Sequence, residues 1–270
     1  MYNSFLKRQG SKVFIAKQII QYFKPHNIYI EPFFGTGNIY FNKEKASSGS
    51  LLNDIDDNVF NLWEVYNNNF EDLLNKIENL FISQSLHKYF LKNKFEDKIM
   101  KALRFLYLSN TSLFGQGSFR LSPDTNTKSV LINNYKSLNG FFEDDKVSNL
   151  DFKQFFKSFS IHSLKQKYPN SLKIMCYNDP PYLGTGNNYS NSFKEQDTID
   201  LFNINCDLAK KYENNYFFAI SEFETDFIKS LTKEKQLNLI KIKDRRNLQN
   251  RRLEILITNY EIENHKNLLF

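Results

Sequence analysis

Short apolar runs alternate along the chain with segments of helical periodicity, and this alternation constrains the fold more than any other feature. Runs with the length and composition of buried strands include SLLND, SLKIMCYNDPPY, NYFFAISE and RLEILITNY. Apolar residues recur at helical spacing in segments such as DNVFNLWEVYNNN and QDTIDLFNINCDLAKKY. Repeated strand and helix units predict an α/β fold whose sheet is mostly parallel, with right-handed crossovers.

The N-terminal and central parts of the chain add helices to this pattern. Ser11 is expected to cap a helix over KVFIAKQIIQYF that Pro25 ends, and IYFNKEKA, which follows a glycine turn, is also predicted to be helical. Residues 67–146 contain amphipathic helical segments followed by a stretch rich in Gly, Ser, Thr and Asn. We therefore expect an inserted helical lobe at residues 67–146, between two parts of one sheet domain at residues 1–66 and 147–270.

The bulk properties argue against several classes of protein. No stretch approaches the roughly 18 apolar residues of a membrane span. The segment MYNSFLKRQGSK lacks the apolar core of a signal peptide, so we expect a cytoplasmic protein. Cys176 and Cys206 show neither a disulfide framework nor zinc spacing, and the four histidines are scattered, so we expect reduced thiols and no metal. A hydrolase is disfavoured because no set of nucleophile, histidine and acid is recognisable.

The charge of the chain favours a polyanionic partner. Its 36 basic and 30 acidic residues give a net charge of +6 and a pI near 9.0, although a Lys- and Asn-rich genome explains this excess equally well. Arginine is more informative, because planar guanidinium groups suit phosphates and base edges. Four arginines crowd into DRRNLQNRR, namely Arg245, Arg246, Arg251 and Arg252. The alternative for this cluster is a solvated turn between two strands.

A glycine turn and a distant acid favour a nucleoside cofactor. In EPFFGTGN, Gly35 and Gly37 lie where a strand meets the next segment, so a ligand can approach the backbone closely. Asp54 follows Gly35 by 19 residues, at the end of the next strand, where an acid can accept hydrogen bonds from both hydroxyls of a ribose. Two glycines fall short of a dinucleotide fingerprint, and no GxxxxGK[ST] motif for a triphosphate occurs. The alternatives are a plain turn and a helix cap at Asp54.

The segment NDPPY presents only hydrogen-bond acceptors at the end of an apolar run. Prolines at positions 180 and 181 have no N–H, so the turn offers the carboxylate of Asp179 and the carbonyl of Pro180. An exocyclic amine on a nucleobase matches this pair, and Tyr182 offers a ring on which the base can stack. When the turn accepts hydrogen bonds from both N–H groups of the amine, the nitrogen lone pair becomes more available to an electrophile. The candidate electrophile is S-adenosylmethionine. The alternative is an ordinary turn after a strand.

These motifs together resemble one known family. EPFFGTG, LLND, NLDF and NDPPY, in this order, are similar to the motifs of the DNA adenine methyltransferase (Dam) family, and the resemblance runs from RQGSK to EILITNY. It implies a Rossmann-like sheet that binds S-adenosylmethionine, with a helical target-recognition lobe inserted after the second strand. It also implies methyl transfer to N6 of an adenine flipped out of double-stranded DNA.

The resemblance carries roles onto individual residues. Lys12 would meet the methionine carboxylate of the cofactor, Asp54 its ribose, and Asp151 with Phe152 its adenine. Arg8 stands where the family usually has an aromatic side chain. The implied cofactor-binding set is Arg8, Lys12, Glu31, Gly35, Gly37, Asp54, Asp151, Phe152 and Asp179. The implied catalytic set is Asp179, Pro180 and Tyr182.

Contacts to DNA are expected from Arg120 and from the four arginines of DRRNLQNRR, with a loop over LGTGNNYSNSF closing on the substrate. The stretch SNTSLFGQGSFRLSP departs from that of relatives acting at GATC, so no recognition sequence is predicted. A cognate restriction endonuclease is a candidate partner. Two alternatives stay open: an RNA exocyclic-amine methyltransferase, against which the inserted lobe argues, and an inactive DNA-binding relative, against which the intact motifs argue.

Overall fold

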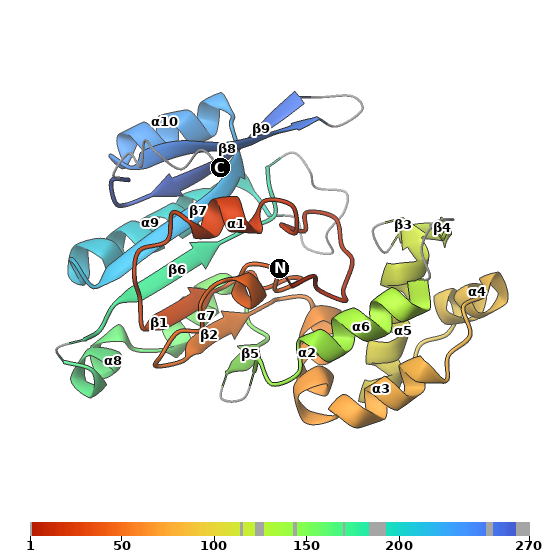
Figure 1. Ribbon diagram of the computed structural model, residues 1–270. Coiled ribbons are helices and arrows are strands. Elements are labelled where there is room, and N and C mark those ends of the chain that lie inside the picture. The colour runs from red at the N-terminus through yellow and green to blue at the C-terminus, as the bar shows by residue number, and fades with distance from the viewer. Residues whose placement is uncertain are drawn as a thin grey trace, which may run out of the picture. The chain divides into compact units, whose positions relative to one another are not determined.

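The structure is a computed structural model that describes residues 2–113, 116–121, 127–142, 145–169, 171–183, 193–246 and 251–262 (Figure 1). The chain divides into two compact units. Unit 1 comprises Met1–Lys17, Pro32–Lys45 and Gly49–Ser158, and unit 2 comprises Gln18–Glu31, Ala46–Ser48 and Phe159–Phe270.

The predicted α/β fold with a mostly parallel sheet is confirmed. Among the described residues, seven strands follow the order β5-β2-β1-β6-β7-β9-β8. Their bounds are β1 Ile28–Glu31, β2 Ser50–Asn53, β5 Lys146–Ser148, β6 Ile174–Asn178, β7 Tyr216–Phe223, β8 Asn238–Arg246 and β9 Arg251–Thr258. The pairs β2–β5, β1–β6 and β6–β7 are parallel, whereas β7–β9 and β8–β9 are antiparallel. The carboxyl ends of β1 and β6 therefore meet at one edge, as do those of β2 and β5.

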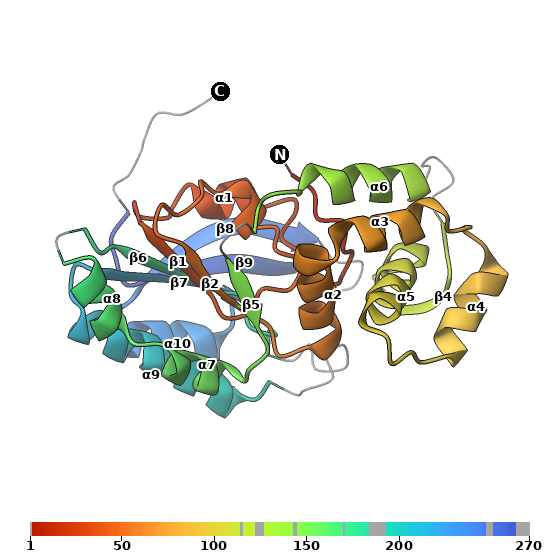
Figure 2. The ribbon, with the colours of Figure 1, turned by 90° about the horizontal axis from the view of Figure 1, so that it is seen from below.

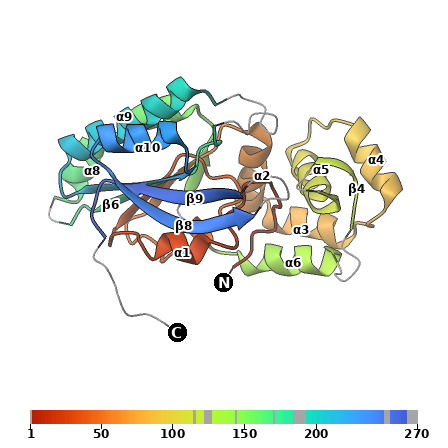
Figure 3. The same cartoon turned by 90° about the horizontal axis from the view of Figure 1, so that it is seen from above.

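In unit 2, helices cover one face of the strands. Helices α9 (Glu195–Lys211) and α10 (Asp226–Glu234) lie on the same side of β6, β7, β8 and β9 (Figure 3), and α8 spans Ile161–Lys167. Asn205 of α9 accepts hydrogen bonds from Asn178 of β6 and from the hydroxyl of Tyr216 on β7. All five residues of β6 are buried, which explains why Ile174, Met175 and Cys176 are consecutive apolar residues instead of alternating with polar ones.

Unit 1 contains most of the predicted central helices. They are α2 Asp57–Asn68, α3 Phe70–Glu78, α4 Gln84–Lys92, α5 Lys98–Thr111, α6 Thr127–Ser137 and α7 Phe152–Ser158. Helices α3, α5 and α6 contact one another (Figure 2), and a short hairpin of β3 (Ser112–Leu113) and β4 (Gln116–Phe119) follows α5. Asp56, Ser83 and Asp97 cap α2, α4 and α5 by accepting backbone N–H bonds. The lobe boundaries at residues 67 and 146 stay a prediction.

An aromatic core lies beneath the glycine turn in unit 1. The indole N–H of Trp63 donates to the carbonyl of Gly35 at 3.0 Å, and the ring of Phe34 contacts that of Trp63 with centroids 5.4 Å apart. The buried rings of this core are Phe5, Phe34, Tyr40, Phe41, Trp63, Tyr66, Tyr135 and Phe142. Helix α2 thus packs on the turn through its aromatic face, and the turn has a rigid support.

Two predicted helices differ from the structure. The helix predicted over KVFIAKQIIQYF is present but confined to α1 (Ala16–Ile20), so Ser11 lies outside it and the predicted cap is wrong. The hydroxyl of Ser11 instead accepts a hydrogen bond from the side chain of Asn38 at 2.8 Å. IYFNKEKA forms only a 3-10 turn at Tyr40–Asn42. Burial of the rings of Tyr40 and Phe41 in the aromatic core overrides the local helical pattern there.

The two glycines of the turn should differ in their tolerance of alanine. Both have positive φ, +51° at Gly35 and +68° at Gly37, so either substitution introduces backbone strain. A Cβ on Gly35 meets nothing within 4 Å, whereas one on Gly37 overlaps the ring of Phe41 and lies 2.9 Å from that of Phe34. We expect Gly35→Ala to lower the free energy of unfolding by about 1 kcal/mol and Gly37→Ala by about 3 kcal/mol.

Urea denaturation of both variants beside the wild type measures these losses. Equal losses for the two alanines would show that the aromatic core does not constrain Gly37.

Candidate active site

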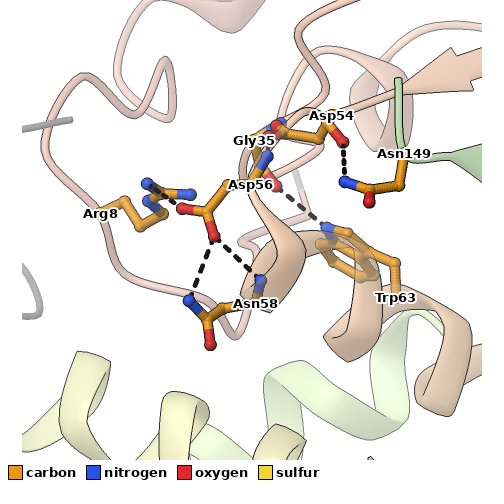
Figure 4. A network of polar contacts seen from close by, with 7 residues as sticks. All are labelled: Arg8, Gly35, Asp54, Asp56, Asn58, Trp63 and Asn149. Carbon is orange, nitrogen blue, oxygen red and sulfur yellow. Dashed lines mark hydrogen bonds and ion pairs between the residues drawn. The ribbon is translucent and has the colours of Figure 1, made fainter. Parts of the chain in front are cut away.

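The carboxylate of Asp54 joins the end of β2 to the glycine turn. Oδ2 accepts the backbone N–H of Gly35 at 2.6 Å, and Oδ1 accepts the backbone N–H of Asp56 at 2.9 Å (Figure 4). The structure thus brings together the glycine and the acid that were predicted to meet. Asp54 is 8% exposed, and burial raises the pKa of its carboxyl group. The two N–H donors and the charge of Arg8 oppose that rise.

Asp56, which the sequence analysis did not single out, is the helix cap. Its Oδ1 accepts the backbone N–H of Asn58 at 2.9 Å at the start of α2, so the alternative of Asp54 as the cap is wrong. Its Oδ2 pairs with Nη2 of Arg8 at 2.9 Å (Figure 4), and that guanidinium group lies 5.9 Å from the ring centroid of Phe105. Arg8 therefore forms an ion pair with the cap of α2, which is two residues after Asp54.

Two asparagines hold the segment after β5 against the end of β2. The side chain of Asn53 donates to the carbonyl of Leu150 at 2.9 Å and accepts its N–H at 3.0 Å. The side chain of Asn149 donates to the carbonyl of Asp54 at 2.9 Å. The NLDF segment, with Asp151 and Phe152, is thereby placed beside Asp54. The asparagines were not predicted, although LLND and NLDF both contain one.

Within the NLDF segment the two predicted residues have different environments. Phe152 is 5% exposed, and its ring lies 5.7 Å from that of Phe33, which precedes the glycine turn. Asp151 is half-buried and accepts the N–H of Lys153 at 2.9 Å, at the start of α7.

Lys12, in another part of unit 1, is 4% exposed and donates to the carbonyl of Gly10 at 3.3 Å. A buried ammonium group of this kind suits an anionic ligand group.

In unit 2, NDPPY follows the buried strand β6. The strand ends at Asn178, whose side chain donates to that of Asn205 on α9. Asp179 is the first residue beyond the strand. Asp179 is half-buried and Pro180 is buried. Because two prolines follow, the carbonyl and carboxylate acceptors at this point have no neighbouring N–H donor for two residues.

The ring of Tyr182 is held by two residues of neighbouring strands. Its hydroxyl donates to Oε1 of Glu254 on β9 at 2.9 Å, and its ring meets that of Phe223 edge to face with centroids 4.5 Å apart. Burial raises the pKa of Tyr182 well above its usual value, and the charges of Asp179 and Glu254 raise it further. Glu254 was not predicted as a site residue, although a glutamate inside the apolar run RLEILITNY was a signal.

Glu31 is buried at the end of β1. It is 2% exposed and accepts the hydroxyl of Tyr29 at 2.8 Å. Burial raises the pKa of Tyr177 on β6, and the charges of Asp179, Glu254 and Glu31 add to that rise. Carboxyl groups from β1, from NDPPY and from β9 therefore act on one buried tyrosine of unit 2.

The cysteines and metal-binding residue types suggest no further chemistry in the described residues. Cys176 is buried in β6, and burial raises the pKa of its thiol to about 12, so a thiolate nucleophile is disfavoured. In the described ranges no group of three or more His, Cys, Asp or Glu side chains is placed to hold a metal ion. Over the same ranges, every helix is too short or too polar to cross a bilayer.

The arginines predicted to bind DNA lie on two hairpins. Arg120 is exposed just after β4, and its backbone N–H donates to the carbonyl of Thr111 at 2.8 Å. At the end of the β8–β9 hairpin the backbone pairs Arg245 with Arg252 and Arg246 with Arg251. The four side chains, residues 247–250 and residues 184–192 of the predicted closing loop lie outside the part of the chain that is described.

Comparison with known proteins identifies the family. The model of the D12 class of N6 adenine-specific DNA methyltransferases matches residues 9–248. A DNA adenine methylase of Vibrio cholerae serotype O1 is 23% identical over 251 residues, covering 88% of this chain and 87% of that protein. A DNA adenine methylase of Serratia marcescens is 24% identical over 251 residues, covering 88% of this chain and 90% of that protein. Since the family match includes the glycine turn, Asp54 and NDPPY, the chain belongs to the D12 class of N6 adenine-specific DNA methyltransferases.

Proposed function

We propose that this enzyme transfers a methyl group from S-adenosylmethionine to N6 of an adenine in double-stranded DNA, at a defined sequence and with the adenine rotated out of the duplex. The observation that carries the proposal is the end of β6, where Asp179 is followed by two prolines and offers acceptors alone. Methylation at a defined sequence would also protect DNA from a cognate restriction endonuclease, which is the partner we propose.

The residues of unit 1 fit a nucleoside cofactor. Space beside Gly35 is open, because a Cβ built there meets nothing within 4 Å. Each carboxylate oxygen of Asp54 accepts one backbone N–H and keeps a lone pair, so the group can also accept ribose hydroxyls. Lys12 suits the carboxylate of the cofactor, and Asp151 with Phe152 suits its adenine. When bound, S-adenosylmethionine supplies an electrophilic methyl group on a sulfonium.

In the proposed reaction, the residues of NDPPY prepare the target amine. Asp179 and the carbonyl of Pro180 accept hydrogen bonds from its two N–H groups. These bonds oppose delocalisation of the nitrogen lone pair into the ring and orient the lone pair for attack. Tyr182 stays protonated because burial raises the pKa of its hydroxyl, so it contributes its ring for stacking and does not act as a base. No enzyme nucleophile is required, in keeping with the burial of Cys176.

The β8–β9 hairpin supports binding of the DNA backbone. Its register places two arginine pairs directly across the ladder, Arg245 with Arg252 and Arg246 with Arg251. Guanidinium groups suit phosphates, because they are planar, always charged and able to bind in a bidentate way. Rotating a base out of the duplex costs about a few kcal/mol, and phosphate contacts from arginine offset it. Arg120 is proposed to contact DNA from the other hairpin.

Replacing Asp179 should abolish methylation and spare DNA binding. Asp179→Ala removes an acceptor for the amine and no phosphate contact, so we expect the methylation rate to fall about 10³-fold or more while the dissociation constant for DNA changes about threefold or less. Asp179→Asn, which keeps one acceptor oxygen, should fall between the wild type and the alanine variant. Methylation-sensitive sequencing of DNA from expressing cells, beside a DNA-binding titration, measures both effects.

Near-normal methylation by Asp179→Ala would reject the role given to NDPPY. N6-methyladenine absent from the DNA of wild-type cells, with methyl transfer to RNA by the purified protein, would reject DNA as the substrate.

Binding of S-adenosylmethionine should weaken in acid because of Asp54. The folded-state pKa of its carboxyl group is raised above the ordinary value of about 4, so the carboxylate that accepts the ribose hydroxyls is lost as the pH falls through the raised pKa. The same shift makes Asp54 oppose folding as the pH rises through that window, because the folded state binds the extra proton. Calorimetric titration across about pH 4 to 8 should show this loss in the wild type. Asp54→Asn should bind more weakly, without that dependence.

A wild-type affinity that does not change with pH would place the ribose elsewhere.

Neutralising the arginine pairs should reduce the salt dependence of DNA binding. For Arg245→Gln with Arg252→Gln, we expect the slope of log K against log salt to become shallower by about 2, because each phosphate contact contributes about 0.9. Lys210→Gln with Lys211→Gln, at the end of α9, is the control with the same loss of charge. Equal slopes for the two double variants would remove the hairpin from the DNA interface.

A further inference from the structure

Glu254 is a carboxylate in the interior of a strand. It is 0% exposed on β9, and the three residues that follow it, Ile255 to Ile257, are also fully buried. Burying a carboxyl group among apolar residues is costly unless hydrogen bonds compensate it. The hydroxyl of Tyr182 supplies one such bond, donating to Oε1 at 2.9 Å. An apolar residue would serve β9 better if packing were the requirement.

The register of the sheet places a second contact beside the first. Glu254 is the cross-strand partner of Phe223 on β7, so both side chains lie on one face of the sheet. Tyr177 and Ser221, joined by a hydrogen bond of 2.8 Å, share this face. The ring of Phe223 meets that of Tyr182 at an interplanar angle of 75°. Adjacent residues of two strands therefore both contact Tyr182.

The two contacts constrain different rotations of the tyrosine. The hydroxyl oxygen lies on the long axis of the ring, so the hydrogen bond to Glu254 sets the direction of that axis. Rotation of the ring about the axis is left to the edge-to-face contact with Phe223. The hydroxyl remains a donor because burial, Asp179 and Glu254 together raise the pKa of Tyr182 well above its usual value.

We propose that Glu254 is a positioning residue for methyl transfer, which accepts the hydroxyl of Tyr182 and thereby fixes the ring on which the target base stacks. Tyr182 is half-buried, so its hydroxyl end is anchored while part of the side chain is accessible. Glu254 lies beyond residue 248, where the family match ends. The proposal rests on the function proposed above, because it assumes that Tyr182 stacks on the base.

The test compares Glu254→Leu, which removes the acceptor, with Glu254→Gln, which keeps an acceptor oxygen of nearly the same size. We expect Glu254→Leu to lower kcat for methyl transfer about 10- to 100-fold, with the KM for DNA changed about twofold or less, because a misplaced group affects the reacting geometry more than binding. Glu254→Gln should restore kcat to within about threefold of the wild type. Tyr182→Phe should lower kcat as Glu254→Leu does, and combining the two changes should add little.

A spectroscopic readout separates positioning from general stability. A duplex with 2-aminopurine at the methylated adenine, found by sequencing, reports stacking by quenching of its fluorescence against an aromatic ring. Quenching should be reduced with Glu254→Leu and retained with Glu254→Gln. Thr258→Val is the matched control, because Thr258 is a buried polar residue of β9 whose hydroxyl donates to Tyr260. It should lower the melting temperature and leave kcat and quenching unchanged.

The outcomes distinguish the two proposals. If the wild type transfers no methyl group to adenine in DNA, the proposed function fails. If the wild type is active and Glu254→Leu keeps its kcat and its quenching, the role of Glu254 alone is rejected. Loss of activity in Glu254→Gln equal to that in Glu254→Leu would also reject it, because the acceptor would then not be the group that matters.

Discussion

The carboxylate of Asp54 is the interaction on which the arrangement of unit 1 depends. It accepts the backbone N–H of Gly35 on one oxygen and that of Asp56 on the other, so one buried side chain joins the end of β2, the glycine turn and the start of α2. The turn, in which both glycines have positive φ, is also held by its backbone, because the N–H of Gly37 donates to the carbonyl of Phe34 at 2.9 Å. Trp63 supports the turn from α2, by donating to the carbonyl of Gly35. The acid assigned to the ribose is therefore also a structural residue.

A different principle organises the acids of unit 2. Asp179 stands at the end of a strand whose five residues are all buried, and the prolines after it remove the N–H donors that would otherwise bind its carboxylate locally. Glu254 enters the same region from β9 and holds the hydroxyl of Tyr182. Acceptors are thus concentrated where we propose that the target amine binds, and burial keeps the neighbouring phenols protonated.

Local sequence patterns predicted much of the fold. Apolar runs predicted β2, β6, β7 and β9, since their residues are buried on both faces or on one. The meeting of Gly35 with Asp54 followed from the rule that neighbouring strands end at one edge. The two predictions that failed did so because of contacts between residues that local patterns do not reveal. Ser11 was predicted to cap a helix, but α1 begins only at Ala16, and the hydroxyl of Ser11 accepts a hydrogen bond from Asn38, 27 residues away. Tyr40 belongs to a segment of helical pattern, but its ring packs in the aromatic core.

Sequence by itself determined the fold class, the order of the motifs and the residue types that the chemistry requires, because these depend on periodicity and on side-chain functional groups. Tertiary structure alone decided which groups those residues contact. It paired Arg8 with Asp56, made Asp56 and not Asp54 the cap of α2, and brought Glu254 to Tyr182 across 72 positions. Such contacts join residues far apart in the chain, and they form only when the strands have taken their register. No local pattern specifies them.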